Sequence, residues 1–341
     1  MTTMQDVARA AGVSVMTVSN VVNGRPRVGA ETRLRVLGVI ADLGYEVNLN
    51  ARRLRAGRTD TVALIVPGFD HLYFGDLAAR LAAALETRGR HLVVEQGGAS
   101  REGELAALSL ARLKMYDGVL LSVVGLDRSD VERMHATTPI VLLGERELPE
   151  RYDHVAMGNV EGGQLATAHM LATGSRSVAI LGGTREPSRG EGGMSQTRTS
   201  GWEAAHRALG REPDPRLVVE LVHHDATEAR QAIARLVASG VPFDGVFAVT
   251  DTVALGVLAG LAAAGLGVPE DVQVVGFDNL RLSEVLVPAL STIDPGHDVM
   301  VTEALRLLDR RISAGGDPVV AEHVTGPVSL VHRASTRRGL G

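Results

Sequence analysis

The sequence predicts an α/β protein with a small all-helical head, and three observations support this prediction. The first sixty residues show helical periodicity and contain no strand-like run. From Thr61 onward, short continuous apolar runs alternate with Ala-rich helical stretches, the pattern typical of doubly wound parallel sheets. A chain of 341 residues is also too long for one ordinary core. We therefore expect a helix-turn-helix head followed by a two-lobed core of doubly wound parallel sheets with a cleft between the lobes.

The first two helices of the head are expected to be short and to have recognisable ends. Thr3 can cap the first helix, because Asp6 follows three residues later and can complete a capping box. Gly12 is expected to end this helix. Ser14 can cap the second helix, which Asn23-Gly24 should terminate. Two short helices joined by a Gly-containing turn are typical of a helix-turn-helix unit.

A third helix is expected to support the first two. It should run from Ala30 to Leu43 and end at Gly44, with an apolar series formed by Leu34, Leu37 and Ile40. A third helix packed against the turn is part of the architecture of DNA-binding heads, although other small helical bundles share it.

The core is expected to contain at least eight strand–helix units, which exceeds one comfortable sheet. The expected strands are Val62–Val66, His91–Glu95, Gly118–Val123, Ile140–Leu143, Ser177–Leu181, Leu217–Val222, Gly245–Val249 and Val272–Phe277. The expected helices are Gly75–Arg88, Gly103–Met115, Glu161–Thr173, Glu228–Ser239 and Thr252–Ala264.

Charge is distributed unevenly between the head and the rest of the chain. Residues 1–60 carry nine Arg and five acidic residues, a net of +4, whereas the remainder carries a net of −9. Any polyanionic partner is therefore expected at the N-terminus, although nine Arg in sixty residues can also arise by chance. Cys is absent, the N-terminus is polar, and no apolar run reaches the roughly 18 residues that span a bilayer. A cytoplasmic protein is expected.

The sequence gives no support for an enzyme. The only lysine, Lys114, lacks the context of a phosphate-binding loop, and Gly190–Ser195 fails the dinucleotide fingerprint at its last position. No nucleophile-elbow or zinc-protease motif is present. His223 and His224 are adjacent and would face opposite sides of a strand, which disfavours a shared metal. We expect no catalytic residues, no metal and no cofactor.

One segment carries a specific resemblance. Residues 6–24 read Asp-Val-Ala-Arg-Ala-Ala-Gly-Val-Ser-Val-Met-Thr-Val-Ser-Asn-Val-Val-Asn-Gly. This run resembles the head-piece signature of the lactose-repressor (LacI/GalR) family, and the resemblance extends over essentially the whole chain. It implies a transcription regulator, expected to be a repressor, that binds a palindromic operator as a homodimer and is controlled by a small molecule. The core would then be periplasmic-binding-protein-like.

The resemblance implies which head residues contact DNA. The second helix would enter the major groove, with Val15, Met16 and Asn20 at base edges. Many family members carry Arg at the position of Asn20. Val18 is expected to pack inside the head rather than on DNA. The remaining contacts, mainly to phosphate, are assigned to Ser14, Thr17, Ser19 and Asn23.

Residues 48–59 resemble the family's hinge segment, an Arg-rich stretch too short to form a stable helix alone. The resemblance implies that Leu54 wedges between base steps in the minor groove, with Ala51, Arg52 and Arg55 beside it. A solvated basic linker is the alternative. The family usually has proline where this chain has Val47, which predicts weaker hinge folding.

The resemblance also implies an effector site at the carboxyl ends of the core strands, where ligands of parallel sheets bind. An aromatic pair with carboxylates and a guanidinium suits a sugar or related polyol. Each residue also has a structural alternative, as a helix cap or part of the core. The expected effector-binding residues are Tyr73, Phe74, Glu145, Arg198, His224, Asp251 and Asp278.

Two departures leave the effector class open. Thr250 replaces a family Asn, and the fourth strand ends in Gly144-Glu145 where Asp is usual. The alternative is a nucleobase-sensing or solute-binding protein of the same two-lobed fold. An extracytoplasmic solute-binding protein would need a signal peptide in place of the helical head.

The expected domains are a DNA-binding head (1–46), a hinge (47–60) and a core (61–341) for effector binding and dimerisation. The first lobe is expected to comprise approximately residues 61–159 and 292–324. The second lobe would comprise approximately residues 160–291 and 325–341. A dimer is expected because Ser335–Gly341 lacks the family's tetramer-forming leucine heptads.

Overall fold

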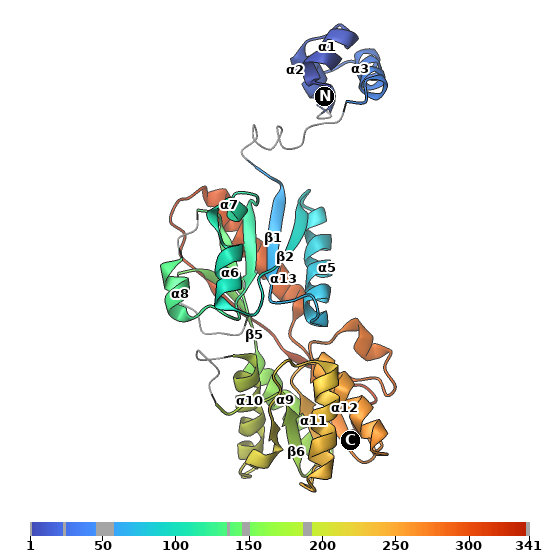
Figure 1. Cartoon of the computed structure of the whole chain (residues 1–341), viewed down its shortest axis with the longest axis vertical. Coiled ribbons are helices and arrows are strands. Elements are labelled where there is room, and N and C mark those ends of the chain that lie inside the picture. Colours follow the sequence, from blue (N-terminus) through green and yellow to red (C-terminus); the bar gives the residue numbers. More distant parts are fainter. Residues whose placement is uncertain are drawn as a thin grey trace. The chain divides into compact units, whose positions relative to one another are not determined.

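The computed structural model describes residues 2–22, 25–45, 58–134, 137–144, 151–186 and 193–338. The chain divides into two compact units, Met1–Thr59 and Asp60–Gly341, drawn in Figure 1. The head and the core are described separately below.

The head consists of α1 (Met4–Ala11), α2 (Val15–Val22) and α3 (Ala30–Asp42). The predicted capping box is present, because Thr3 and Asp6 bond each other's main-chain N–H. Gly12 ends α1 in the left-handed conformation with φ 63°. Ser14 Oγ accepts a hydrogen bond from the main-chain N–H of Thr17 at 3.1 Å, so it caps α2 as predicted. The core of the head is formed by Val7, Ala8, Ala11, Val18, Val21, Val36 and Tyr45.

The apolar series predicted for the third helix is only partly used for packing. Leu34 and Leu37 are 72% and 46% exposed, whereas Val36 is fully buried and Ile40 packs against the core. The helix is therefore rotated relative to the predicted face, because Val36 and its neighbours fill the space between α1 and α2.

The first lobe of the core is built on a six-stranded parallel sheet with the order β11-β5-β4-β3-β1-β2. Its strands are β1 (Thr61–Val66), β2 (His91–Gln96), β3 (Gly118–Ser122), β4 (Ile140–Leu143), β5 (Asp153–Met157) and β11 (His323–Gly326). Its helices are α5 (Leu72–Glu86), α6 (Arg101–Ala107), α7 (Leu110–Leu113), α8 (Arg128–Arg133) and α13 (His297–Ala314). In Figure 1, α5 lies beside β2 and the sheet is covered by helices.

The second lobe is built on another six-stranded sheet with the order β12-β10-β9-β8-β6-β7, parallel except for β12. Its strands are β6 (Val178–Leu181), β7 (Val218–Val219), β8 (Gly245–Ala248), β9 (Gln273–Phe277), β10 (Ser291–Asp294) and β12 (Ser329–Val331). Its helices are α9 (Asn159–Ala172), α10 (Met194–Ala208), α11 (Ala226–Ala238), α12 (Asp251–Ala263) and the short η1 (Pro215–Leu217) and η2 (Arg281–Glu284).

The chain crosses between the lobes three times, and two crossings differ from the expected boundaries. Because β10 pairs with β9, the second lobe extends to Asp294 rather than to residue 291. Because β11 pairs with β5, the first lobe extends to Gly326 rather than to residue 324. The two expected boundaries were therefore placed two or three residues too early.

Several elements also differ from the expected ones. The run Leu217–Val222 forms a strand only over Val218–Val219, and the expected helix Gly103–Met115 is divided into α6 and α7. The division occurs at Leu108, whose N–H closes the end of α6. Four strands and three helices are not among the expected elements named above: β5, β10, β11, β12, α8, α10 and α13.

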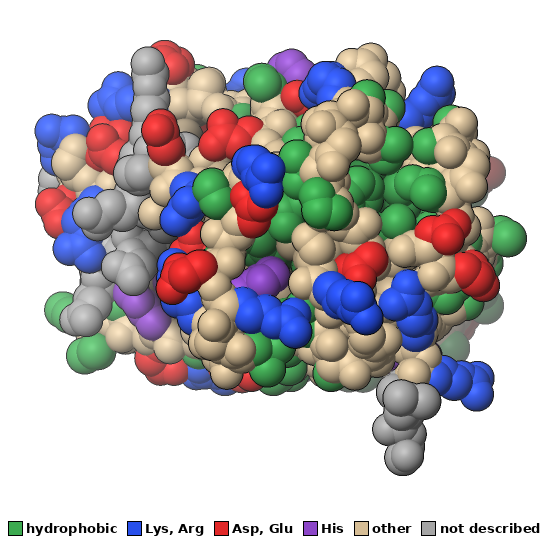
Figure 2. All heavy atoms as spheres, turned by 90° about the horizontal axis from the view of Figure 1, so that it is seen from below, with side chains coloured by type: hydrophobic (Ala, Val, Ile, Leu, Met, Phe, Trp, Pro, Cys, Tyr) green, Lys and Arg blue, Asp and Glu red, His purple; other side chains and the backbone are tan. Residues whose placement is uncertain are grey.

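The face of the core seen in Figure 2 carries Arg, Asp and Glu side chains interspersed among one another, with hydrophobic side chains gathered in one area. A face of mixed charge does not attract a polyanion as a single-sign patch does. Within the described ranges, no helix has the length and apolar character needed to cross a membrane.

Candidate functional site

The second helix of the head presents a polar and apolar surface to solvent. Ser14, Val15 and Met16 are exposed, with Met16 69% exposed. Thr17, Ser19 and Asn20 are half-buried on the same helix. Val15 and Met16 are adjacent apolar side chains at the start of this helix, and their exposure leaves them accessible to base edges.

Val18 is fully buried in the core of the head, as predicted. Five residues of the predicted DNA contacts lie outside the described residues: Asn23, Ala51, Arg52, Leu54 and Arg55.

Tyr73 and Phe74 lie in the first turn of α5, directly after β1 and its loop. Their rings are 5.1 Å apart in an edge-on arrangement, and both are half-buried. The ring of His71 lies 6.2 Å from that of Phe74. These three aromatic side chains form the first lobe's part of a cluster that we call the lobe junction. Its other members are His297 of α13 and, from the second lobe, Arg198, His224 and Asp278.

Arg198 is buried in the second lobe with only 1% of its surface exposed. Its Nε donates to Asn159 Oδ1 at 2.8 Å, and Nη1 donates to the carbonyl of Val249. Nη2 lies 3.6 Å from Met157 Sδ, and the guanidinium carbon is 3.4 Å from the ring centre of Phe277. Arg198 thus connects the end of β5 with the ends of β8 and β9. Through these contacts the Arg198 side chain holds the ends of the three strands together at the lobe junction.

Asp278 lies at the end of β9 and is 3% exposed. Its Oδ1 is 3.9 Å from Arg198 Nη1. Asp278 has φ 111° and the next residue, Asn279, has φ 46°. Such positive values cost a non-glycine residue about 1–3 kcal/mol and concentrate at ligand sites. The strained backbone therefore marks this strand end as the strongest candidate for a ligand contact.

Asp251 does not lie where the effector prediction requires. It is 1% exposed, and its Oδ1 accepts a hydrogen bond from Thr292 Oγ1 at 2.6 Å. Oδ2 accepts from Ser283 Oγ at 2.6 Å and from the N–H of Leu280 at 2.9 Å. The helix cap is Thr250, whose hydroxyl oxygen accepts from Val253 N–H. The carboxylate is used within the second lobe, so we remove Asp251 from the candidate effector set.

His224 is half-buried and has φ 54°. Its Nε2 lies 2.9 Å from Ser195 Oγ and 3.2 Å from the carbonyl oxygen of Gly182. Burial lowers the pKa of His224, and the charges of His71 and Arg198 act in the same direction. Because Gly182 directly follows β6, these contacts place His224 at the carboxyl ends of the strands of the second lobe. Glu145, also predicted at this site, lies outside the described residues.

The sequence prediction did not select His71 or His297 of the lobe junction, nor Phe277 and Asn159, which contact the Arg198 guanidinium. Phe277, the residue before Asp278, packs the face of its ring against the Arg198 guanidinium. Asn159 orients the same guanidinium. His297 lies on a helix that was not predicted, so only a prediction of α13 would have revealed it.

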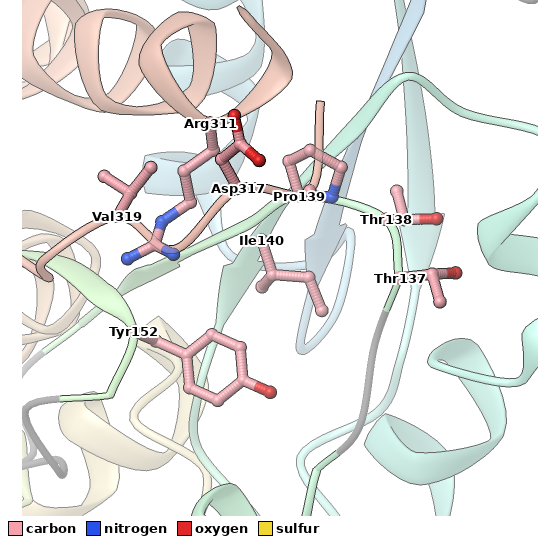
Figure 3. A pocket seen from close by; sticks show the side chains of 9 residues that line it. Thr137, Thr138, Pro139, Ile140, Tyr152, Arg311, Asp317 and Val319 are labelled. Atoms are coloured by element: carbon pink, nitrogen blue, oxygen red, sulfur yellow. The ribbon is translucent and has the colours of Figure 1, made fainter. Parts of the chain in front are cut away.

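A different hollow, of about 170 Å³, lies at the opposite, amino edge of the first sheet (Figure 3). Tyr152, Ile140 and Arg311 line it, at the starts of β5 and β4 and near the end of α13. Arg311 Nε donates to the fully buried Asp153, which also accepts from Arg310 at 2.7 Å. This ion cluster ties α13 to β5, and we assign the hollow no ligand. Among the described residues, no three His, Asp or Glu side chains are grouped as a metal site.

Two family descriptions match different parts of the chain. Residues 3–48 match bacterial regulatory proteins of the lacI family, and residues 167–336 match the periplasmic binding protein-like domain. Catabolite control protein A of Priestia megaterium is 30% identical, covering 98% of this chain and 99% of that protein. The transcriptional regulator CelR of Thermobifida fusca is 33% identical, with coverages of 96% and 95%.

Solved structures agree with these sequence matches. The complex of the regulator CelR with cellobiose is 30% identical, has a TM-score of 0.70 and covers 98% of this chain and 100% of its own. A putative regulator of the same family from Sanguibacter keddieii is 33% identical, with a TM-score of 0.75 and coverages of 82% and 98%. The lac repressor dimer bound to operator shares the fold at a TM-score of 0.81. The helix-turn-helix head, the two-lobed core and these similarities over nearly the full length show that the chain belongs to the lacI family of bacterial regulatory proteins.

Proposed function

We propose that this protein is a transcriptional repressor that binds a palindromic operator as a homodimer and responds to a small molecule at the lobe junction. The DNA-binding part of this proposal rests on one observation: Val15 and Met16, at the start of α2, are exposed, whereas the apolar residues on the other side of the helix pack in the core of the head. Two symmetric heads would read two half-sites of the operator. Binding to operator DNA would place the protein in the cytoplasm, at the nucleoid.

The contrast between Met16 and Val18 tests this part. Met16→Ala removes an exposed side chain, so the melting temperature should not change while operator affinity falls about threefold to tenfold. Val18→Ala opens a cavity in the head core and should destabilise it by about 1–3 kcal/mol. Thermal unfolding and operator titrations by fluorescence anisotropy measure both effects. Unchanged operator affinity in Met16→Ala would contradict the assigned reading surface.

The effector is proposed to be a sugar or related polyol. Tyr73 and Phe74 offer aromatic surface, and Asp278 offers a carboxylate at a strained strand end. Carboxylates bind paired hydroxyls, and aromatic rings pack on the apolar faces of sugar rings. The CelR complex contains cellobiose, which supports a saccharide as the first class to test.

A thermal-shift screen against sugars, sugar phosphates and nucleobases tests the effector class. A ligand at 100 times its Kd should stabilise the fold by about 2.7 kcal/mol. Asp278→Asn, a residue that tolerates positive φ, should lose most of this stabilisation. A shift produced only by nucleobases, or an equal shift in Asp278→Asn, would reject the proposed effector class or its site.

A further inference from the structure

His297 occupies the point at which the chain passes from the second lobe to the first, as the first residue of α13. Its side chain is 2% exposed. The imidazole stacks on the ring of Tyr73, with 5.7 Å between ring centres. Its Nε2 lies 2.6 Å from the main-chain carbonyl oxygen of Asp278, in the other lobe. A buried imidazole therefore bridges two residues that are proposed to contact the effector.

The hydrogen bond to the carbonyl oxygen of Asp278 determines which ring nitrogen of His297 carries the hydrogen. A carbonyl oxygen only accepts, so Nε2 must carry the hydrogen and donate it. Nδ1 is then an acceptor in the neutral ring. This atom is buried and has no hydrogen-bond partner among the described residues.

Buried polar atoms without a partner are rare in folded proteins and are frequent at functional sites. We propose that Nδ1 of His297 accepts a hydrogen bond from a hydroxyl or N–H group of the effector. This inference rests on the proposed effector site at the lobe junction and makes His297 a residue that determines its specificity. Because the carboxylate of Asp278 is also an acceptor, the two residues together favour a ligand with adjacent donors, such as the vicinal hydroxyls of a polyol.

Two substitutions separate the functions of the imidazole. His297→Gln can keep a donor for the carbonyl of Asp278 at the ε position and lacks the acceptor at the δ position. His297→Phe keeps a ring on Tyr73 and removes both nitrogens. His91→Gln is the matched control, because His91 is an exposed imidazole on β2 of the same lobe.

The experiment is a calorimetric titration of the full-length protein and its variants with D-glucose, D-ribose, cellobiose and hypoxanthine. For each compound that binds the unmodified protein, His297→Gln should weaken binding about threefold to tenfold, and His91→Gln should not change it. The ¹⁵N resonance of His297 Nδ1, identified by its loss in His297→Gln, should shift when the same compound is added. His297→Phe should bind at least as weakly as His297→Gln.

The possible failures are distinguishable. A compound that binds both His297→Gln and the unmodified protein equally well, and leaves the Nδ1 resonance unmoved, overturns the inference but leaves the effector site intact. If no compound binds and the resonance never moves, the inference is overturned together with the polyol and nucleobase classes. The operator titration with Met16→Ala still tests the regulator function independently.

Discussion

Asp251 holds a carboxylate in the interior of the second lobe, surrounded by Thr292, Ser283 and the N–H of Leu280. Burial raises the pKa of Asp251 to about 6, although these hydrogen bonds partly oppose the effect. In the unfolded chain the pKa returns to its ordinary value near 3.8. The native state therefore binds this proton more tightly than the unfolded state. The resulting contribution to stability is fully present below about pH 4 and is lost as pH rises to about 6.

Replacing Asp251 with Asn should remove this pH dependence. At pH 4.5 the carboxyl is mostly protonated, and Asn resembles it: the amide oxygen can accept from Leu280 and Ser283 as Oδ2 does, while the amide NH2 donates to Thr292 Oγ1. The stability of the variant at pH 4.5 should therefore lie within about 1 kcal/mol of that of the unmodified protein. Between pH 4.5 and pH 7.5 the unmodified protein should lose about 2 kcal/mol of stability relative to the variant, since only the carboxyl ionises. Urea unfolding at several pH values measures the difference. Asp317→Asn, at an exposed carboxylate, is the control. A pH-independent difference for Asp251→Asn would show that its pKa is not raised.

The same residue shows the limit of position-based prediction. The rule that ligands bind beyond strand ends selected a region in which the structure places Tyr73, Phe74, His224 and Asp278. It cannot say which way a side chain points, and Asp251 turns inward because Thr292 and Ser283 offer it hydroxyl groups from β10 and η2. Those partners are about thirty to forty residues away in the sequence and could not be anticipated.

At the scale of elements, Arg198 is positioned by two helices that approach each other through glycine. A Cβ added at Gly163 of α9 would lie 2.5 Å from the carbonyl oxygen of Arg198. A Cβ added at Gly201 of α10 would lie 2.1 Å from the carbonyl oxygen of Val160. Because both obstacles are main-chain atoms, the helices would have to separate to admit a methyl group. Close packing of α9 and α10 thus fixes the base of the Arg198 side chain.

Gly201→Ala should therefore destabilise the core by about 1–3 kcal/mol, despite the higher helix propensity of Ala. Gly75→Ala provides the matched comparison, because Gly75 lies in α5 and a Cβ there would meet nothing within 4 Å. That substitution should stabilise the protein by about 0.5–1 kcal/mol. Chemical unfolding of both variants measures the two changes. Equal effects at the two positions would mean that α9 and α10 are less closely packed than described.

The elements that the sequence predicted and those that it missed differ in how they are buried. Central strands such as β1 and β8 are continuous apolar runs and were recognised. The strand β5 begins with Asp153, a residue that can be buried only because Arg310 and Arg311 reach it from α13. The edge strands β11 and β12 are short and partly exposed, so their apolar signal is weak. Helix α13 did carry helical periodicity at Met300, Ala304 and Leu308, but its many charged residues obscured it.

At the scale of the whole molecule, charge separates the two proposed activities. Residues 1–60 carry a net charge of +4 and the remainder −9, and the core face in Figure 2 shows no area of only positive side chains. The net positive charge of the head and the segment that follows it favours attraction to DNA phosphates there, whereas the net negative charge of the remainder opposes it. The core, in contrast, recognises its ligand through short-range contacts at the lobe junction, which salt screens little.

Operator binding should consequently weaken steeply with salt. Each phosphate that the protein neutralises contributes about 0.9 log units of affinity per tenfold change in salt, so six contacts would give a slope of about −5. Anisotropy titrations with operator DNA between 50 and roughly 300 mM salt measure this slope. Met16→Ala should lower the affinity for operator at every salt concentration and leave the slope unchanged, because a methionine at a base edge neutralises no phosphate. A slope near zero would exclude the head as an electrostatic DNA-binding unit. A shallower slope in Met16→Ala would instead mean that this residue orients the head on the phosphates, so that its removal displaces the cationic contacts as well.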